Sequence, residues 1–185
     1  MLNLEIECRF LEIDKQNLIQ TLLDLGAIDK GESMINEMII YDRDGDWRNE
    51  NKFIRIRKIG DNVKITYKKY RSQSVDGASE IELAVDNYSQ AKLFFENIGF
   101  KVFRHQQKLR HTFILDNIAF DIDTWPQIPP YLEIEAGSEQ DLIKATNLIG
   151  YTWQNAIFNN AKWIIESKYN IPLGELKYFT FDKFE

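Results

Sequence analysis

Three charged side chains near the start of this 185-residue chain, Glu5, Glu7 and Arg9, are of types that bind metals and anions. They alternate with apolar side chains, and this period of two predicts a strand over residues 4–10 with all three charges on one face. Adjacent carboxylates repel each other, and each charge resists burial. A cation at the carboxylates and an anion at the arginine would stabilise such a row, so the pattern favours a binding site.

The same alternation of charged and apolar residues recurs in later predicted strands, some of which carry bases and others acids. The charged positions of these strands are Arg55, Arg57, Lys64, Lys68, Glu80, Glu82, Lys108, Arg110, Asp121, Asp123, Glu133 and Glu135. A sheet with one face in water is the plain alternative for any single strand. A wet face, however, normally mixes its charges with Ser, Thr, Asn and Gln. Strand after strand with an almost wholly ionic face favours a charged interior.

This sorting of acids and bases suits one type of ligand. Clustered arginines and lysines bind a polyphosphate, the arginines through paired hydrogen bonds and the lysines as point charges. Carboxylates cannot bind phosphate directly, but they can hold Mg²⁺ or Mn²⁺, which bridges to phosphate oxygens. A sheet that is charged on one face and apolar on the other is also what a barrel with a hydrated, ligand-filled interior requires.

Helices are predicted between these strands. Asp14 can cap a helix over residues 15–25, and Ser138 can cap another that ends near residue 149. Further helices are predicted over residues 88–98 and 154–168. These helices are expected to cover the apolar face of the sheet.

The remaining segments predict one strand, two polar loops and a tail. Residues 34–42 predict a strand, and the polar segment 71–77 is a candidate lid. Residues 42–51 carry acids around Gly45 but lack the glutamate that a calcium loop places six residues after its glycine, so we interpret them as a solvated turn. The aromatic tail, residues 171–185, is expected to pack on the body of the protein.

Composition narrows the function classes. The length suits a single domain over residues 1–185. The formal net charge of −6 argues against nucleic acid or an anionic membrane as a partner, although an acidic protein can still hold a basic cavity. The single cysteine, Cys8, cannot form an internal disulfide, and neither a signal peptide nor a membrane span is evident, so we expect a cytoplasmic protein. Zinc-ligand spacing, a Ser-His-Asp arrangement and a P-loop are absent. The oligomeric state is not readable, and a homodimer stays open.

The order of these motifs resembles that of the CYTH superfamily, the triphosphate tunnel metalloenzymes. The resemblance covers about residues 2–150, and the helix and tail over 151–185 are expected to pack on the barrel. The motifs that carry it are, in order, Glu5-x-Glu7-x-Arg9, Phe53-Ile54-Arg55-Ile56-Arg57, Ile65-Thr66-Tyr67-Lys68, Glu80-Ile81-Glu82, Lys108-x-Arg110, Phe120-Asp121 and Glu133-Ile134-Glu135.

The resemblance implies an α+β fold, an eight-stranded antiparallel β-barrel or tunnel with helices packed outside. It implies that the metal, Mg²⁺ or Mn²⁺, is held by Glu5, Glu7, Asp121, Glu133 and Glu135. It implies that the phosphates of a small-molecule triphosphate are held by Arg9, Arg55, Arg57, Lys64, Lys68, Lys108 and Arg110. The residues it nominates as catalytic are Glu5, Glu7, Arg9, Lys68 and Asp121.

Two reactions follow from the resemblance. In class IV adenylyl cyclases the ribose 3′-hydroxyl attacks the α-phosphorus of ATP and releases pyrophosphate, and this activity is the first expectation. In triphosphatases, which hydrolyse inorganic tripolyphosphate, thiamine triphosphate or a nucleoside triphosphate, water attacks a terminal phosphorus instead. Two alternatives stay open, namely a module that binds a polyphosphate or nucleotide without turnover, and a purely structural domain.

Overall fold

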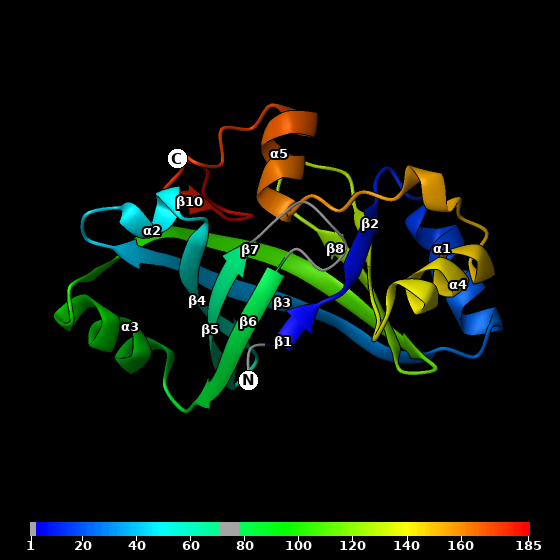
Figure 1. Cartoon of the computed structure of the whole chain (residues 1–185), viewed down its shortest axis with the longest axis horizontal. Coiled ribbons are helices and arrows are strands. Elements are labelled where there is room, and N and C mark those ends of the chain that lie inside the picture. The colour runs from blue at the N-terminus through cyan, green and yellow to red at the C-terminus, as the bar shows by residue number, and fades with distance from the viewer. Residues whose placement is uncertain (1–2, 71–77) are drawn as a thin grey trace.

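Ten strands form one curled sheet in this computed structural model, which describes residues 3–70 and 78–185 (Figure 1). The strands are β1 (Asn3–Glu5), β2 (Glu7–Phe10), β3 (Ile28–Asp42), β4 (Lys52–Ile59), β5 (Asn62–Tyr70), β6 (Ala78–Val85), β7 (Phe100–Leu115), β8 (Ile118–Thr124), β9 (Tyr131–Glu135) and β10 (Tyr178–Phe179). Their order across the sheet is β1-β6-β5-β4-β3-β7-β8-β9-β2, with β10 added beside β7. The candidate lid at residues 71–77 lies outside the described residues.

The first segment of the chain joins the two edges of the sheet, because it contains both terminal strands of the strand order. β1 pairs with β6, whereas β2 pairs with β9, and only Ile6 separates the two strands. The carbonyl of Ile6 accepts a hydrogen bond from Ala136 N at 3.0 Å. The single strand predicted over residues 4–10 is therefore wrong in detail, because the chain leaves one partner and joins another at Ile6. With β1 and β2 counted as one interrupted strand, β1–β9 form the predicted eight-stranded antiparallel curled sheet.

Two long antiparallel strands, β3 and β7, run across the whole molecule (Figure 1). Both are longer than predicted, because β3 begins at Ile28 rather than near residue 34, and β7 begins at Phe100 rather than near residue 106. The register between them shifts twice, so each strand bends without breaking. The curvature turns the inner faces of the flanking strands toward one another.

The helices are α1 (Lys15–Asp24), α2 (Asp46–Asn49), α3 (Tyr88–Asn97), α4 (Glu139–Leu148), the 3₁₀ turn η1 (Trp153–Asn155) and α5 (Ala161–Tyr169). The helices α1, α3 and α4 cover the outer, apolar face of the sheet, whereas α2 and α5 each also contribute side chains to the inner side. The predicted caps are confirmed, since Asp14 accepts from Asn17 N and Ser138 accepts from Asp141 N. In Figure 1, α1 and α4 lie together at one end of the sheet and α3 lies at the other.

Separate apolar clusters fill the space between these helices and the sheet. Leu18, Leu22 and Leu142 pack on Phe10 and Phe120 under α1 and α4, and all five are buried. A second cluster, which includes Ile54 and Ile56, lies under α2 and α3. The apolar alternate residues of the strands therefore point outward into helices, which leaves the charged alternates on the inside.

The segments around α2 and α5 differ from prediction. Residues 42–51 contain the helical turn α2, whose Trp47 packs edge-on against Phe100 at 5.0 Å between ring centres. The helix predicted over residues 154–168 begins only at Ala161, where Asn160 caps it. Just before it, Ile157 exchanges two backbone hydrogen bonds with Arg9, at 2.8 and 2.9 Å, which an α-helix there would not allow.

The C-terminal tail lies against the sheet. β10 pairs with β7 in parallel, and Phe179 is fully buried against Trp125 and Leu173. Within the part of the chain that the structure describes, no helix is long and apolar enough to cross a membrane.

Candidate active site

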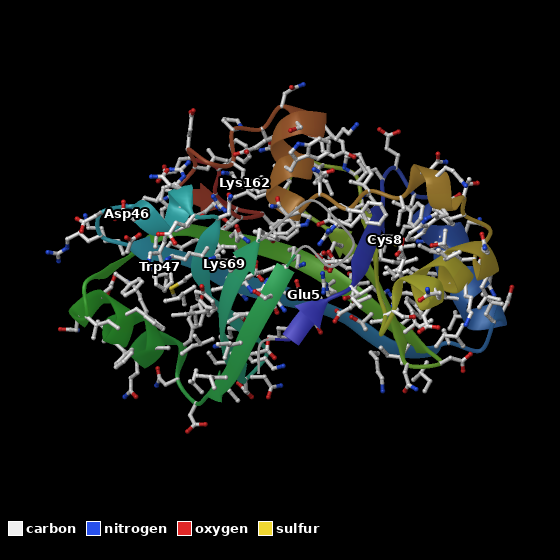
Figure 2. The ribbon with its side chains drawn as sticks, viewed as in Figure 1. Glu5, Cys8, Asp46, Trp47, Lys69 and Lys162 are labelled. Atoms are coloured by element: carbon white, nitrogen blue, oxygen red, sulfur yellow. The ribbon has the colours of Figure 1, made fainter. Side chains whose placement is uncertain are left out.

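The concave side of the sheet encloses a cavity of about 470 Å³. Every side chain that the sequence nominated lines it, except Asp121. Cationic side chains outnumber carboxylates in the lining; they are Arg9, Arg48, Arg55, Arg57, Lys64, Lys68, Arg104, Lys108, Arg110 and Lys162. The carboxylates are Glu5, Glu7, Glu37, Glu80, Glu82, Glu133 and Glu135. Figure 2 labels Glu5 on the first strand and Lys162 at the start of α5, so the lining draws on both ends of the chain.

One wall of the cavity is an ion-pair network centred on Arg110. Its guanidinium donates to Asp121 and Asp123, each at 2.6 Å, and to Glu133 at 2.8 Å. Asp123 is fully buried and also accepts from Lys108 at 2.7 Å. The predicted metal ligand Asp121 is held by Arg110 and Thr112. Its role at a metal stays a prediction.

Arg9 joins this wall to the first strand. It pairs with Glu7 and with Glu133, both at 2.7 Å, and donates to the backbone oxygen of Asn159 at 3.0 Å. Its buried Nε has no hydrogen-bond partner among the described residues, and the same holds for Nε of Arg55. A buried donor without an acceptor is costly. The wall of the cavity therefore carries two buried donors that the described residues leave unsatisfied.

The adjoining wall, on β3 and β4, is organised by Glu37, which the sequence analysis did not nominate. Glu37 is 3% exposed and accepts from Arg57 at 2.8 Å and from the amide of Gln106 at 2.6 Å. Arg55 lies 3.7 Å from the same carboxylate. Burial alone would raise the pKa of Glu37, but Arg57 and Arg55, with Lys108 and the Gln106 hydrogen bond, lower it well below its ordinary value.

Carboxylates from two neighbouring strands meet on the first strand's side of the cavity. Glu7 on β2 lies directly opposite Glu135 on β9, and Glu135 has no ion-pair partner within residues 3–70 and 78–185. Burial, with Glu133 and Glu7, raises the pKa of Glu135. On β1, burial raises the pKa of Glu5 to about 8, even though Lys68 pairs with it. This corner carries negative charge that a cation would relieve.

The donor set at this corner fits a hard divalent cation in its chemistry. Mg²⁺ takes oxygen ligands, and proteins commonly supply one or two carboxylates while substrate phosphates supply others. Among the residues that the structure describes, no three acid, histidine or cysteine side chains are arranged to hold one ion. Glu133 instead pairs with Arg9 and Arg110, and Glu5 pairs with Lys68. Glu135 has no ion-pair partner among the described residues, and Glu7, directly opposite it, is paired only through Oε1 with Arg9, so these two carboxylates are the pair we nominate to share an ion with a bound phosphate chain.

Sequence reasoning also missed the end of the cavity that the C-terminal segment covers. Arg104 on β7 donates from Nη1 to the carbonyl of Leu173 at 2.8 Å, and Arg48 donates from Nη2 to the carbonyl of Gly174 at 2.9 Å. Tyr41 and Phe53 line the same cavity, with their ring centres 6.4 Å apart. Arg104 lies in the part of β7 that was not predicted as a strand, and Arg48 lies in the segment interpreted as a solvated turn. The alternation pattern therefore could not reach either residue.

The comparison with known families agrees with this geometry. The CYTH domain matches residues 3–150, which is most of the chain. The chain belongs to the CYTH family. This family is one of triphosphate tunnel metalloenzymes, which implies a divalent metal, and its known activities are those of cyclases and triphosphatases.

One relative and one solved structure that this chain resembles carry adenylate cyclase in their names. A Methanocaldococcus jannaschii protein named "Putative adenylate cyclase" is 24% identical over 133 residues, which is 71% of this chain and 76% of that protein. The structure of a Vibrio parahaemolyticus protein described as a "putative adenylate cyclase" aligns with a TM-score of 0.75 at 12% identity, covering 90% of this chain and 99% of that one. This second likeness is one of fold alone.

A third neighbour has a different activity in its description. It is a Hippeastrum protein described as a "putative adenylyl cyclase" with "a dominant" triphosphatase activity. It aligns with a TM-score of 0.64 at 13% identity, covering 94% of this chain and 99% of that one. The same fold is therefore found in a protein described as a putative adenylate cyclase and in one described with a triphosphatase activity.

Proposed function

We propose that this CYTH protein is a divalent metal-dependent enzyme that acts on a triphosphate inside the tunnel, with conversion of ATP to cyclic AMP and pyrophosphate as its first activity. The observation that carries the proposal is the composition of the cavity. Basic side chains predominate in it, buried arginine donors lack partners, and the Glu7–Glu135 pair faces the same space. A phosphate chain with a bound Mg²⁺ or Mn²⁺ complements all three features.

The residues of the chain would act mainly by binding and orienting. Glu7 and Glu135, with Glu5 and Glu133 beside them, would hold the ion, which supplies charge neutralisation at the phosphate oxygens when bound. Arg9 and Arg55, which line the cavity, would direct guanidinium N–H groups at phosphate oxygens. Fixed donors lower the barrier by holding the chain in line with the attacking oxygen.

Aromatic side chains in the lining support a nucleotide over inorganic tripolyphosphate. Phe53 and Tyr70 line the cavity, and their ring centres lie 6.1 Å apart. Aromatic faces stack on bases whatever the base is. In cyclisation, the ribose 3′-oxygen forms a bond to the α-phosphorus while the bond from that phosphorus to the α,β-bridging oxygen breaks, so pyrophosphate leaves.

Hydrolysis of a triphosphate is the second candidate. The Hippeastrum neighbour supports it, because its description gives the triphosphatase activity as dominant on the same fold. The chemistry at the phosphate groups is closely related, but water replaces the 3′-hydroxyl and attacks a terminal phosphorus. The site then needs the same cations and the same carboxylates.

A substrate panel with resolved products tests the proposal. Purified protein is incubated with ATP, thiamine triphosphate or tripolyphosphate, with Mg²⁺ or Mn²⁺, and cyclic AMP, pyrophosphate and phosphate are quantified separately. Cyclic AMP and pyrophosphate in equal amounts support the cyclase. Phosphate without cyclic AMP rejects the cyclase in favour of the triphosphatase, and no product from any substrate with either metal overturns the enzymatic proposal.

A further inference from the structure

Two arginines at the end of the cavity under the C-terminal segment differ from the other tunnel arginines in their partners. Arg9, Arg55, Arg57 and Arg110 all pair with carboxylates. Arg48 and Arg104 instead donate to the neutral carbonyls of residues 173 and 174, and Arg104 also donates from Nε to the amide oxygen of Gln106 at 2.8 Å. Neither has a carboxylate within ion-pair distance in the part of the chain that the structure describes.

The positive charge at this end is therefore not balanced locally. Arg104 is 5% exposed, and burial lowers its pKa to about 10. Glu166 and Glu37 act on it only from beyond ion-pair distance, and both have other partners: Glu166 accepts from Gly174 N at 2.6 Å, and Glu37 pairs with Arg57 at 2.8 Å. A buried charge whose hydrogen-bond partners are all neutral is costly, and the cost falls when an anion arrives.

The remaining donors of these side chains are available to the cavity that both line. A guanidinium carries five N–H donors, and the described contacts use two on Arg104 and one on Arg48. Ile39 on β3 lies opposite both Arg55 on β4 and Arg104 on β7, so these two arginines reach the cavity at the same level of the sheet. Ala161, in the first turn of α5, lines the cavity too, and a helix N-terminus adds partial positive charge.

We propose that Arg48 and Arg104 form a second anion subsite, which binds the terminal phosphate of a linear polyphosphate chain without a metal ion. The phosphate identity rests on the proposed function, whereas the anion site itself rests on the uncompensated arginines. No carboxylate among the described residues lies within ion-pair distance of either arginine to hold a metal, and the arginines themselves supply the positive charge. The Glu7–Glu135 pair, on β2 and β9, lies on strands separated from β7 by β8, so the two sites are formed by different strands.

The test is binding of inorganic tripolyphosphate in excess EDTA, measured by isothermal titration calorimetry on the full chain. We expect the wild type to bind, and Arg48→Gln and Arg104→Gln each to weaken binding at least ten-fold. The matched control is Arg43→Gln, which removes the same charge from an exposed residue of the same segment that does not line the cavity. Its binding constant is expected to equal that of the wild type.

Two further readouts separate this role from a purely structural one. Tripolyphosphate in EDTA is expected to raise the melting temperature of the wild type but not that of Arg104→Gln. If Arg104→Gln does not fold, the comparison of Arg48→Gln with Arg43→Gln decides, because Arg48 is an exposed residue. The proposal is overturned if EDTA abolishes wild-type binding, or if the folded variants bind as the wild type does and differ only in stability.

The failure of this subsite and the failure of the proposed enzyme are distinguishable. Binding in EDTA requires no turnover, so it can be measured even if no triphosphate is converted. Conversely, Glu7→Gln is expected to stop turnover while it leaves EDTA-resistant binding within two-fold of the wild type. Loss of that binding in Glu7→Gln would contradict the separation of the two subsites.

Discussion

Replacing Glu37 by glutamine tests the role of the buried carboxylate that holds two tunnel arginines in place. Glutamine keeps the shape of the side chain but removes its charge. Arg57 then loses a charge-assisted hydrogen bond of 2.8 Å, and Arg55 loses a charge partner at 3.7 Å. The amide of Gln106, which donates to Glu37 at 2.6 Å, then faces a neutral amide in place of a carboxylate. We therefore expect Glu37→Gln to destabilise the fold and to loosen both arginines.

The size of the effect follows from burial. Removing one partner of a buried ion pair costs about 3–5 kcal/mol, because the other charge stays buried without compensation. Arg55 keeps Glu80 at 3.5 Å, so we expect the lower end of this range, about 3 kcal/mol. For a chain of this length, 1 kcal/mol shifts the melting temperature by about 2–4 °C, which predicts a fall of about 6–12 °C.

The pH dependence supplies a second, independent signature. The folded protein lowers the pKa of Glu37 below its ordinary value of 4.5, so the unfolded chain binds this proton at a higher pH than the folded protein does. The stability from Glu37 is therefore fully present above about pH 4.5 and is lost as the pH falls toward the folded pKa. The difference in stability between wild type and Glu37→Gln is expected to stay constant from pH 7 to about pH 5 and to shrink as the pH falls below 4.5.

Thermal and urea unfolding, followed by circular dichroism at several pH values, measure both effects. The control is Glu32→Gln. Glu32 lies on the same strand, β3, but its carboxylate is at the surface, where it pairs with Lys15 of α1. Exposed pairs contribute only about 0–1 kcal/mol, so this variant should melt near the wild type. A Glu37→Gln protein that melts within 2 °C of the wild type at pH 7 would refute the account of this wall, with 2 °C corresponding to roughly 1 kcal/mol.

Two other predictions concern stability. Asp123→Asn is expected to lower the free energy of unfolding by about 3 kcal/mol, measured with urea, because Asp123 is fully buried between Lys108 and Arg110. A decrease below about 1 kcal/mol would show that the Arg110 network does not depend on Asp123. Phe179→Ala is expected to cost about 3–5 kcal/mol in thermal unfolding, since Phe179 is fully buried in the tail cluster, whereas the exposed Phe181→Ala should cost little. Equal melting of both phenylalanine variants would mean that the tail adds no stability.

Alternation along the strands predicted much of the fold, because one face meets helices and the other meets charge. The pattern failed where long-range pairing decides the structure. Residues 28–33 carry mostly polar side chains and Gly31, yet they form part of β3 because β7 pairs with them. The helix predicted from residue 154 begins later in the structure, because Ile157 pairs with Arg9 and Asn160 caps the helix.

The candidate site was predicted only where residues follow a regular strand. Most nominated side chains line the cavity, but their roles in catalysis and metal binding remain predictions. Glu37 was missed because it follows Asn36 in a strand segment where charged and apolar residues do not alternate. Arg48 was missed because α2 is held by the packing of Trp47 on residues far along the chain, which no local pattern reveals.

The central claim is that carboxylates of the first and last tunnel strands support metal-dependent chemistry on a triphosphate. The most direct measurement is product release from the best substrate of the panel, at saturating Mg²⁺ or Mn²⁺, by wild type, Glu7→Gln and the surface control Glu32→Gln. The account predicts normal turnover in Glu32→Gln and none detectable in a folded Glu7→Gln protein. Turnover at the wild-type rate in Glu7→Gln would contradict it.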